Sequence, residues 1–200
     1  MNTYEQEQAL TDKYGTIVMN QIAGSFYDKF CIERVTDKET QVQGVDYYFW
    51  KSTNERAIKQ KVDIKFDFYE NSNFALETHQ QYTGVGEQSW VHHDGDIWVA
   101  YFKIFQRKVY LIKTSELQRF MNTDLYKNRK IFETNRKVNG KSGGFKNFRF
   151  EELPVDRIIK VDLAVNPFET DDLLKTKTSL FDAVLYRNIW ENIFYLLIYQ

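Results

Sequence analysis

Val62-Asp63-Ile64-Lys65-Phe66-Asp67-Phe68 alternates apolar and charged residues. A period of two is typical of a β-strand, because successive side chains along a strand point to opposite faces of the sheet. We therefore predict a strand whose apolar face packs on the core. Its other face carries Asp63, Lys65 and Asp67 together.

The next alternating run, residues 74–81, is predicted to pair with this strand as an antiparallel hairpin, because a polar, turn-like segment separates the two. In that register Lys65 lies opposite Glu77, and Asp63 lies opposite His79. A slip of one residue would move Glu77 to the apolar side. A solvated sheet face with a weak Lys65–Glu77 ion pair is the alternative interpretation of the same pattern.

Periodicity on either side of this pair predicts the remaining elements. Helices are expected over residues 3–30, 114–120 and about 178–199, and further strands over residues 45–50, 96–105 and 108–113. Two hundred residues that are 42% hydrophobic suffice for a single domain with its own core. The predicted fold class is α/β, with a mixed sheet flanked by helices, a basic insertion at about 121–153 and an apolar C-terminal helix.

Charge is unevenly distributed, although the formal net charge of the chain is only −1. Residues 1–102 hold 9 Lys/Arg and 16 Asp/Glu, whereas residues 103–160 hold 15 Lys/Arg and 6 Asp/Glu. Residues 127–150 combine four phenylalanines with eight basic residues and one acid, Glu133. The basic residues are Lys127, Arg129, Lys130, Arg136, Lys137, Lys141, Lys146 and Arg149. We predict that they contact nucleic-acid phosphates; a solvated surface is the alternative.

Several features narrow the class of protein. A single cysteine, Cys31, cannot form an internal disulfide, and no signal peptide or membrane-spanning run is present, so a cytoplasmic protein without membrane contact is expected. The absence of a glycine-rich phosphate loop argues against a nucleotide hydrolase. His92-His93 lacks a third ligand at suitable spacing and is interpreted as a pair of surface histidines. The C-terminal helix is expected in the core or, alternatively, in a homodimer interface.

A further carboxylate, Asp46, follows Gly44-Val45, and a spacer of 16 residues separates it from Asp63. Hard cations such as Mg²⁺ prefer oxygen ligands and are usually held by one or two carboxylates together with substrate phosphate. A lysine beside such a cation can steady developing negative charge. Asp46, Asp63, Lys65 and Glu77 therefore form a candidate catalytic metal site.

The same residues resemble the motifs of the PD-(D/E)xK nuclease superfamily, which has the restriction-endonuclease-like fold. Residues 62–120 are similar to phage-encoded members in particular. The matching positions beyond the site are Asp67, Asn73, the run Phe74-Ala75-Leu76-Glu77, Ser89 and the strand beginning at Asp96. The chain departs from the family pattern at Val45, at Asn71-Ser72-Asn73 and at Gln88-Ser89-Trp90.

The resemblance implies Mg²⁺ or Mn²⁺ as cofactor and DNA as substrate. It implies Asp46, Asp63 and the main-chain carbonyl of Ile64 as metal ligands, Lys65 as the group that aligns the nucleophile, and Glu77 as a further ligand or general base. Some members add an acid from the first helix, for which Glu5 and Glu7 are the candidates here.

The expected function is that of a metal-dependent deoxyribonuclease, with an endonuclease favoured. The alternative is a catalytically inactive nuclease-fold protein that binds nucleic acid or a protein partner. A protein that assembles through its C-terminal helix is a third interpretation.

Overall fold

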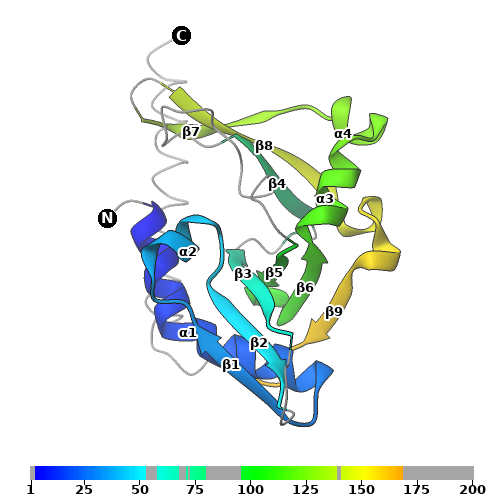
Figure 1. Cartoon of the computed structure of the whole chain (residues 1–200). Coiled ribbons are helices and arrows are strands. Elements are labelled where there is room, and N and C mark those ends of the chain that lie inside the picture. The colour runs from blue at the N-terminus through cyan, green and yellow to red at the C-terminus, as the bar shows by residue number, and fades with distance from the viewer. Residues whose placement is uncertain are drawn as a thin grey trace. The chain divides into compact units, whose positions relative to one another are not determined.

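A computed structural model describes residues 3–52, 58–67, 71, 73–79, 96–138 and 141–168. Two compact units are present, residues 1–164 and 165–200, and the described helices and strands belong to the first (Figure 1). The predicted helix at 178–199 lies outside the described residues, as do Ser89 and His92-His93. No helix in the described ranges has the length and apolar character needed to cross a bilayer.

The helices, in chain order, are α1 (Thr3–Phe26), α2 (Lys38–Val42), α3 (Thr114–Met121) and α4 (Asp124–Lys127), with the 3-10 turns η2 (Ile104–Gln106), η3 (Phe150–Glu152) and η4 (Val155–Arg157). The strands are β1 (Phe30–Arg34), β2 (Tyr47–Lys51), β3 (Gln60–Asp67), β4 (Asn73–His79), β5 (Trp98–Lys103), β6 (Lys108–Lys113), β7 (Phe132–Val138), β8 (Lys141–Arg149) and β9 (Ile159–Asp162).

Six of these strands form a mixed sheet in the order β1-β2-β3-β5-β6-β9. Its strands pair antiparallel except β3 and β5, which run parallel. A smaller antiparallel sheet has the order β4-β8-β7. The predicted α/β class with a mixed sheet is confirmed.

The predicted hairpin between the strands at 62–68 and 74–81 is wrong. β3 lies between β2 and β5, so Lys65 is opposite Tyr101, and β4 pairs instead with β8, where Glu77 is opposite Phe145. β5 is buried along nearly its whole length, as expected of a strand in the interior of a sheet that is covered on both faces. Because β2 and β5 pair with the two edges of β3, no edge is left for a hairpin with β4.

Helix α1 packs on one face of the large sheet, toward which β2 directs Tyr47 and Phe49. The Tyr47 hydroxyl donates to the Thr11 carbonyl at 3.3 Å, and the ring of Phe49 lies 5.6 Å from that of Phe26. Helix and strand approach closely at Gly15, where an added Cβ would stand 2.6 Å from the Tyr47 hydroxyl oxygen. This packing leaves no room for a side chain at position 15, and the sequence has glycine there.

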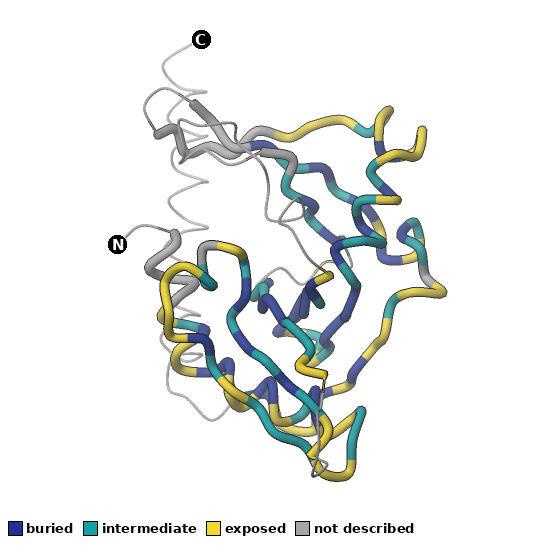
Figure 2. The backbone as a smooth tube through the Cα atoms, in the orientation of Figure 1, coloured by how far each residue is buried: buried dark blue, intermediate teal, exposed yellow. Residues whose placement is uncertain are grey.

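The opposite face of β5 and β6 is covered by β4, β8, α3 and α4 rather than by helices alone. One hydrophobic cluster joins residues from all of these elements. In Figure 2 the tube of β5 and β6 is dark blue over most of its length, in agreement with their burial. The predicted basic insertion therefore contributes strands to the core: Phe148 and Phe150 are both buried in this cluster.

Candidate active site

Asp46 enters the sheet through a short, specifically shaped segment. The chain leaves α2 through Gly44, whose φ of 77° is in the left-handed region that glycine adopts without strain. The Asp46 N–H then donates to the Val62 carbonyl at 2.8 Å, although Val62 already faces Tyr47 in the β2–β3 ladder. The regular ladder stops here, and Asp46 stands where β2 meets β3.

The Asp46 carboxylate is held against the main chain of β3. Its Oδ2 accepts a hydrogen bond from the Ile64 N–H at 2.9 Å, and the carboxyl also hydrogen-bonds with Asp63. Burial, followed by the negative charge of Asp63, raises the pKa of Asp46 to about 7. The Lys65 ammonium and the Ile64 N–H act in the opposite direction.

Asp63 and Lys65 complete this group, which we call the carboxylate site (Asp46, Asp63 and Lys65). Asp63 is only 4% exposed. The Lys65 ammonium lies 3.1 Å from Asp63 Oδ1, and the Lys65 side chain is 26% exposed. Two residues apart on one strand, these side chains share a face, as the alternation predicted. The structure thus brings together three of the four predicted catalytic residues.

The donor set of the carboxylate site fits a hard divalent cation. Two acids in contact repel each other when both are ionised, and a cation between them relieves that repulsion. Within the described ranges no group of three or more His, Cys, Asp or Glu gathers in a way that could hold a metal. Mg²⁺ or Mn²⁺ held by Asp46 and Asp63 would therefore complete its shell with water, main-chain oxygen or substrate phosphate. A role for the Ile64 carbonyl as the main-chain ligand stays a prediction.

Glu77 does not take the place that the sequence suggested. It lies in β4 of the small sheet, partly buried, and not opposite Lys65. The His79 side chain lies outside the described residues, and so do those of Glu5 and Glu7. A catalytic or metal-binding role for Glu77 stays a prediction.

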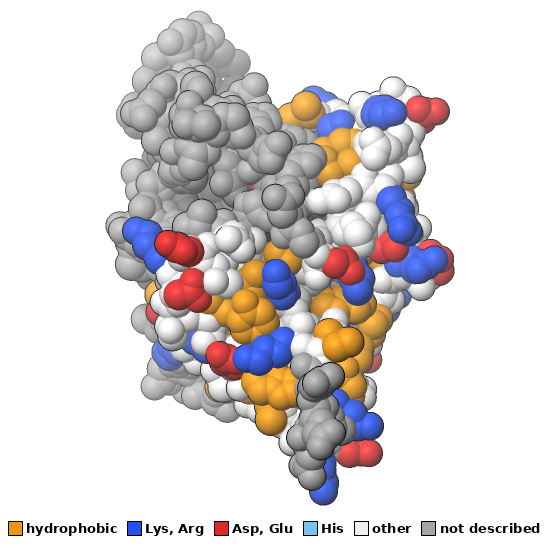
Figure 3. All heavy atoms as spheres, viewed as in Figure 1, with side chains coloured by type: hydrophobic (Ala, Val, Ile, Leu, Met, Phe, Trp, Pro, Cys, Tyr) orange, Lys and Arg blue, Asp and Glu red, His pale blue; other side chains and the backbone are white. Residues whose placement is uncertain are grey.

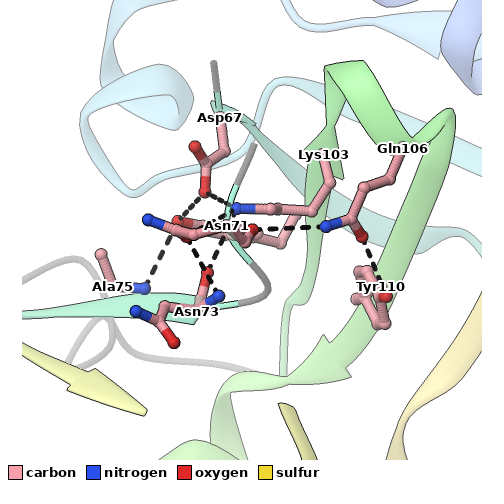
Figure 4. A network of polar contacts seen from close by, with 8 residues as sticks. Asp67, Asn71, Asn73, Ala75, Lys103, Gln106 and Tyr110 are labelled. Carbon is pink, nitrogen blue, oxygen red and sulfur yellow. Dashed lines mark hydrogen bonds and ion pairs between the residues drawn. The ribbon is translucent and has the colours of Figure 1, made fainter. Parts of the chain in front are cut away.

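Asp67, on the same face of β3 as Asp63, belongs to a different network (Figure 4). Its Oδ2 accepts hydrogen bonds from the Lys103 ammonium at 2.7 Å and from the Tyr101 hydroxyl at 2.8 Å. Lys103 is fully buried and also donates to the Asn73 carbonyl at 3.2 Å. This buried pair fastens the first residue of β4 to the ends of β3 and β5.

Sequence reasoning did not find Lys103, although a signal existed. Lys103 ends a strand that is otherwise apolar or aromatic, Trp98-Val99-Ala100-Tyr101-Phe102. A charged side chain that is 0% exposed requires a partner of opposite charge, and Asp67 is opposite it in the parallel ladder. Only the β3–β5 pairing identifies that partner.

Seven of the eight predicted nucleic-acid contacts divide into three groups. Lys127, Lys130 and Arg149 are exposed, Arg129 forms an ion pair with Glu152, and the side chains of Arg136, Lys137 and Lys141 lie outside the described residues.

Lys146 is the exception among them, and its prediction as a surface cation is wrong. It is 5% exposed, and its ammonium donates to the Tyr126 carbonyl at 2.7 Å. The Tyr126 ring centroid lies 4.1 Å from the same ammonium. Burial lowers the pKa of Lys146. Alternation along β8 turns this residue inward, on the same face as Phe148.

No protein-family model, no curated protein and no solved structure matches this chain. The chemistry of the carboxylate site must therefore be inferred from its own residues.

Proposed function

We propose that this protein is a metal-dependent nuclease of PD-(D/E)xK type that hydrolyses DNA phosphodiester bonds, with endonuclease action favoured. The observation that carries the proposal is the meeting of Asp46 and Asp63 carboxylates beside the Lys65 ammonium. These residues come from separate segments of the chain and meet at the junction of β2 and β3, where Asp63 is buried and Asp46 and Lys65 are partly buried. Clustered ionisable groups with a shifted pKa are typical of functional sites.

Each residue has a distinct task in this proposal. A divalent cation bound there would make hydroxide available near neutral pH and stabilise charge on the phosphate. Asp46, fixed by the Ile64 N–H, and Asp63 supply the ligand oxygens. Lys65, positioned by Asp63 and partly open to solvent, can orient the attacking water and stabilise negative charge that develops on the phosphate oxygens.

The wider setting follows from the same proposal. Mg²⁺ or Mn²⁺ is the cofactor and DNA is the partner, contacted in part by the exposed cations of the basic segment. The expected location is the cytoplasm of a bacterial or phage-infected host cell. A homodimer would suit cleavage of both strands of a duplex.

Cleavage assays test the proposal. Purified protein with Mg²⁺ or Mn²⁺ should cut DNA, and EDTA should stop it. Asp63→Asn and Lys65→Ala should each lower the cleavage rate by about 10²-fold or more while the thermal unfolding transition persists. Asp162→Asn and Lys160→Ala, which change exposed residues of β9, serve as matched controls and should cut normally. Normal cutting by both site variants would refute the assignment.

The absence of a third acidic ligand in the described ranges favours one alternative, a nuclease-fold protein that binds nucleic acid or a protein partner without cutting. Retention of DNA in EDTA, with no product after metal is added, would support this binder. A steep loss of DNA binding with salt would indicate phosphate contacts under either function.

A further inference from the structure

Two aromatic and two basic residues extend the face of the sheet on which the carboxylate site lies. Tyr48 of β2 is directly opposite Lys61 of β3, so their side chains share a face. Because faces repeat every second residue, Trp50 belongs to this face, and so do Asp63 and Lys65. We call Tyr48, Trp50, Lys59 and Lys61 the aromatic stripe. Lys59 belongs to it because its ammonium lies 4.7 Å from the Trp50 ring centroid and 5.4 Å from that of Tyr48.

The residues of β2 that pack against α1 lie on its other face, so the stripe is not needed for burial against α1, although Tyr48 packs in part against a small cluster of Val35, Val45 and Ile97. Tyr47 and Phe49 are buried there. Tyr48 and Trp50, in contrast, are only partly buried, and Lys59 is exposed. Figure 3 shows hydrophobic side chains and basic side chains gathered together over β1 and β2 on this side of the molecule.

This combination matches the chemistry of an unpaired nucleic-acid strand. Aromatic side chains stack on exposed bases, and lysine ammonium groups neutralise phosphates. The bases of an intact duplex are stacked on one another and offer no free faces to Tyr48 or Trp50. Among the residues that the structure describes, Lys59 is held by the aromatic rings and by an ion pair with Glu33 in which both side chains are about half exposed. Such exposed pairs are weak, so Lys59 can turn to a phosphate at little cost.

We infer that the aromatic stripe binds single-stranded DNA and leads its backbone to the carboxylate site. The inference deepens the proposed function, since it specifies the substrate as DNA with unpaired bases. Its geometric basis has two parts. The β2–β3 register places Tyr48 opposite Lys61. Lys61 in turn lies two residues before Asp63, on the same face of β3.

Fluorescence anisotropy in EDTA separates this binding from cleavage. The probes are a labelled oligothymidylate, a DNA duplex of equal length and a single-stranded RNA. Trp50→Leu and Tyr48→Leu keep apolar bulk but remove the π face, and each should weaken binding of the oligothymidylate about 5- to 150-fold. Duplex affinity should change less than about twofold, because duplex bases are not available for stacking. Phe105→Leu, which alters an exposed aromatic residue in η2, is the control and should bind normally.

Lys59→Gln provides an independent test that does not depend on the aromatic positions. It should reduce the slope of log affinity against log salt by about 0.7, the value for one phosphate contact on a single strand. Lys160→Gln on β9 should leave the slope unchanged.

Three results would overturn the inference. They are wild-type affinity for single strands in folded Trp50→Leu and Tyr48→Leu, equal losses for duplex and single strand, and tighter binding of RNA than of DNA. Binding that depends on the stripe without cleavage in Mg²⁺ would sink the nuclease proposal alone. Cleavage of duplex that is indifferent to the stripe would sink this inference alone.

Discussion

Asp63 and Asp67 lie on the same face of the same strand and each forms an ion pair with a lysine, yet their surroundings differ. Asp67 receives two short hydrogen bonds and its partner, Lys103, is fully buried. Asp63 faces a second acid, Asp46, and its partner, Lys65, reaches solvent. The first pair is satisfied by the fold alone. The second places like charges together, an arrangement that a stable fold does not need and that a bound cation would relieve.

The largest expected effect comes from breaking the structural pair. Lys103→Met leaves the Asp67 carboxylate buried without its counter-charge and should lower the free energy of unfolding by about 3–5 kcal/mol. Urea denaturation measures this. Lys108→Met is the matched control, because Lys108 forms an exposed pair with Asp162 at 3.7 Å and should cost less than about 1 kcal/mol. Equal losses of unfolding free energy in Lys103→Met and Lys108→Met would show that the buried Asp67–Lys103 pair is no more important for stability than an exposed pair.

The second effect concerns the pH dependence of stability. The pKa of Asp46 is about 7 in the folded protein and near 3.8 when unfolded, so the folded state binds the extra proton between those values. Stability without metal should therefore fall as pH rises from about 4 to about 7. In EDTA, Asp46→Asn should lack this loss, so its advantage in free energy of unfolding over the wild type should grow by about 2 kcal/mol between about pH 5 and about pH 8.

Asp162→Asn, at an exposed acid, should follow the wild-type curve throughout that range. Parallel curves for Asp46→Asn and wild type would mean that Asp46 ionises normally. The carboxylate site would then hold no unrelieved repulsion between Asp46 and Asp63, and in this respect it would not differ from the Asp67–Lys103 pair.

The smallest effect is on metal affinity. Below about pH 7 a cation must displace the proton of Asp46, so Mn²⁺ affinity should fall by about tenfold per pH unit. Calorimetric titration with Mn²⁺ over this range measures the slope, and Asp63→Asn should abolish the binding. Affinity independent of pH would show that Asp46 is not a ligand.

The sequence pattern predicted an element correctly where that element depends on residues close together in the chain. The strands at 62–68 and 108–113 and the helix at 114–120 follow from alternation and helical spacing, and the structure contains all three within one or two residues. Lys65 and Asp63 meet because they are two residues apart on one strand, which the sequence shows directly. The short strand β1 and the edge strand β9 gave too few alternating residues to be recognised.

Pattern failed where a long-range choice decided the outcome. The turn chemistry after Phe68 favoured a hairpin, yet β5 pairs with β3 and β4 joins β8. The basic segment suggested a surface insertion, yet β8 directs Lys146 and Phe148 into the core. Composition reports how many charges a segment holds, but not toward which face a strand turns each of them.

The sequence by itself determined an α/β chain with an acid-x-lysine strand, because side-chain alternation is a property of the backbone. The tertiary structure alone decided that Asp46 joins Asp63, that Asp67 is taken up by Lys103 and that Glu77 lies in another sheet. Those outcomes depend on strand order and register, which are set by the burial of residues far apart in the chain.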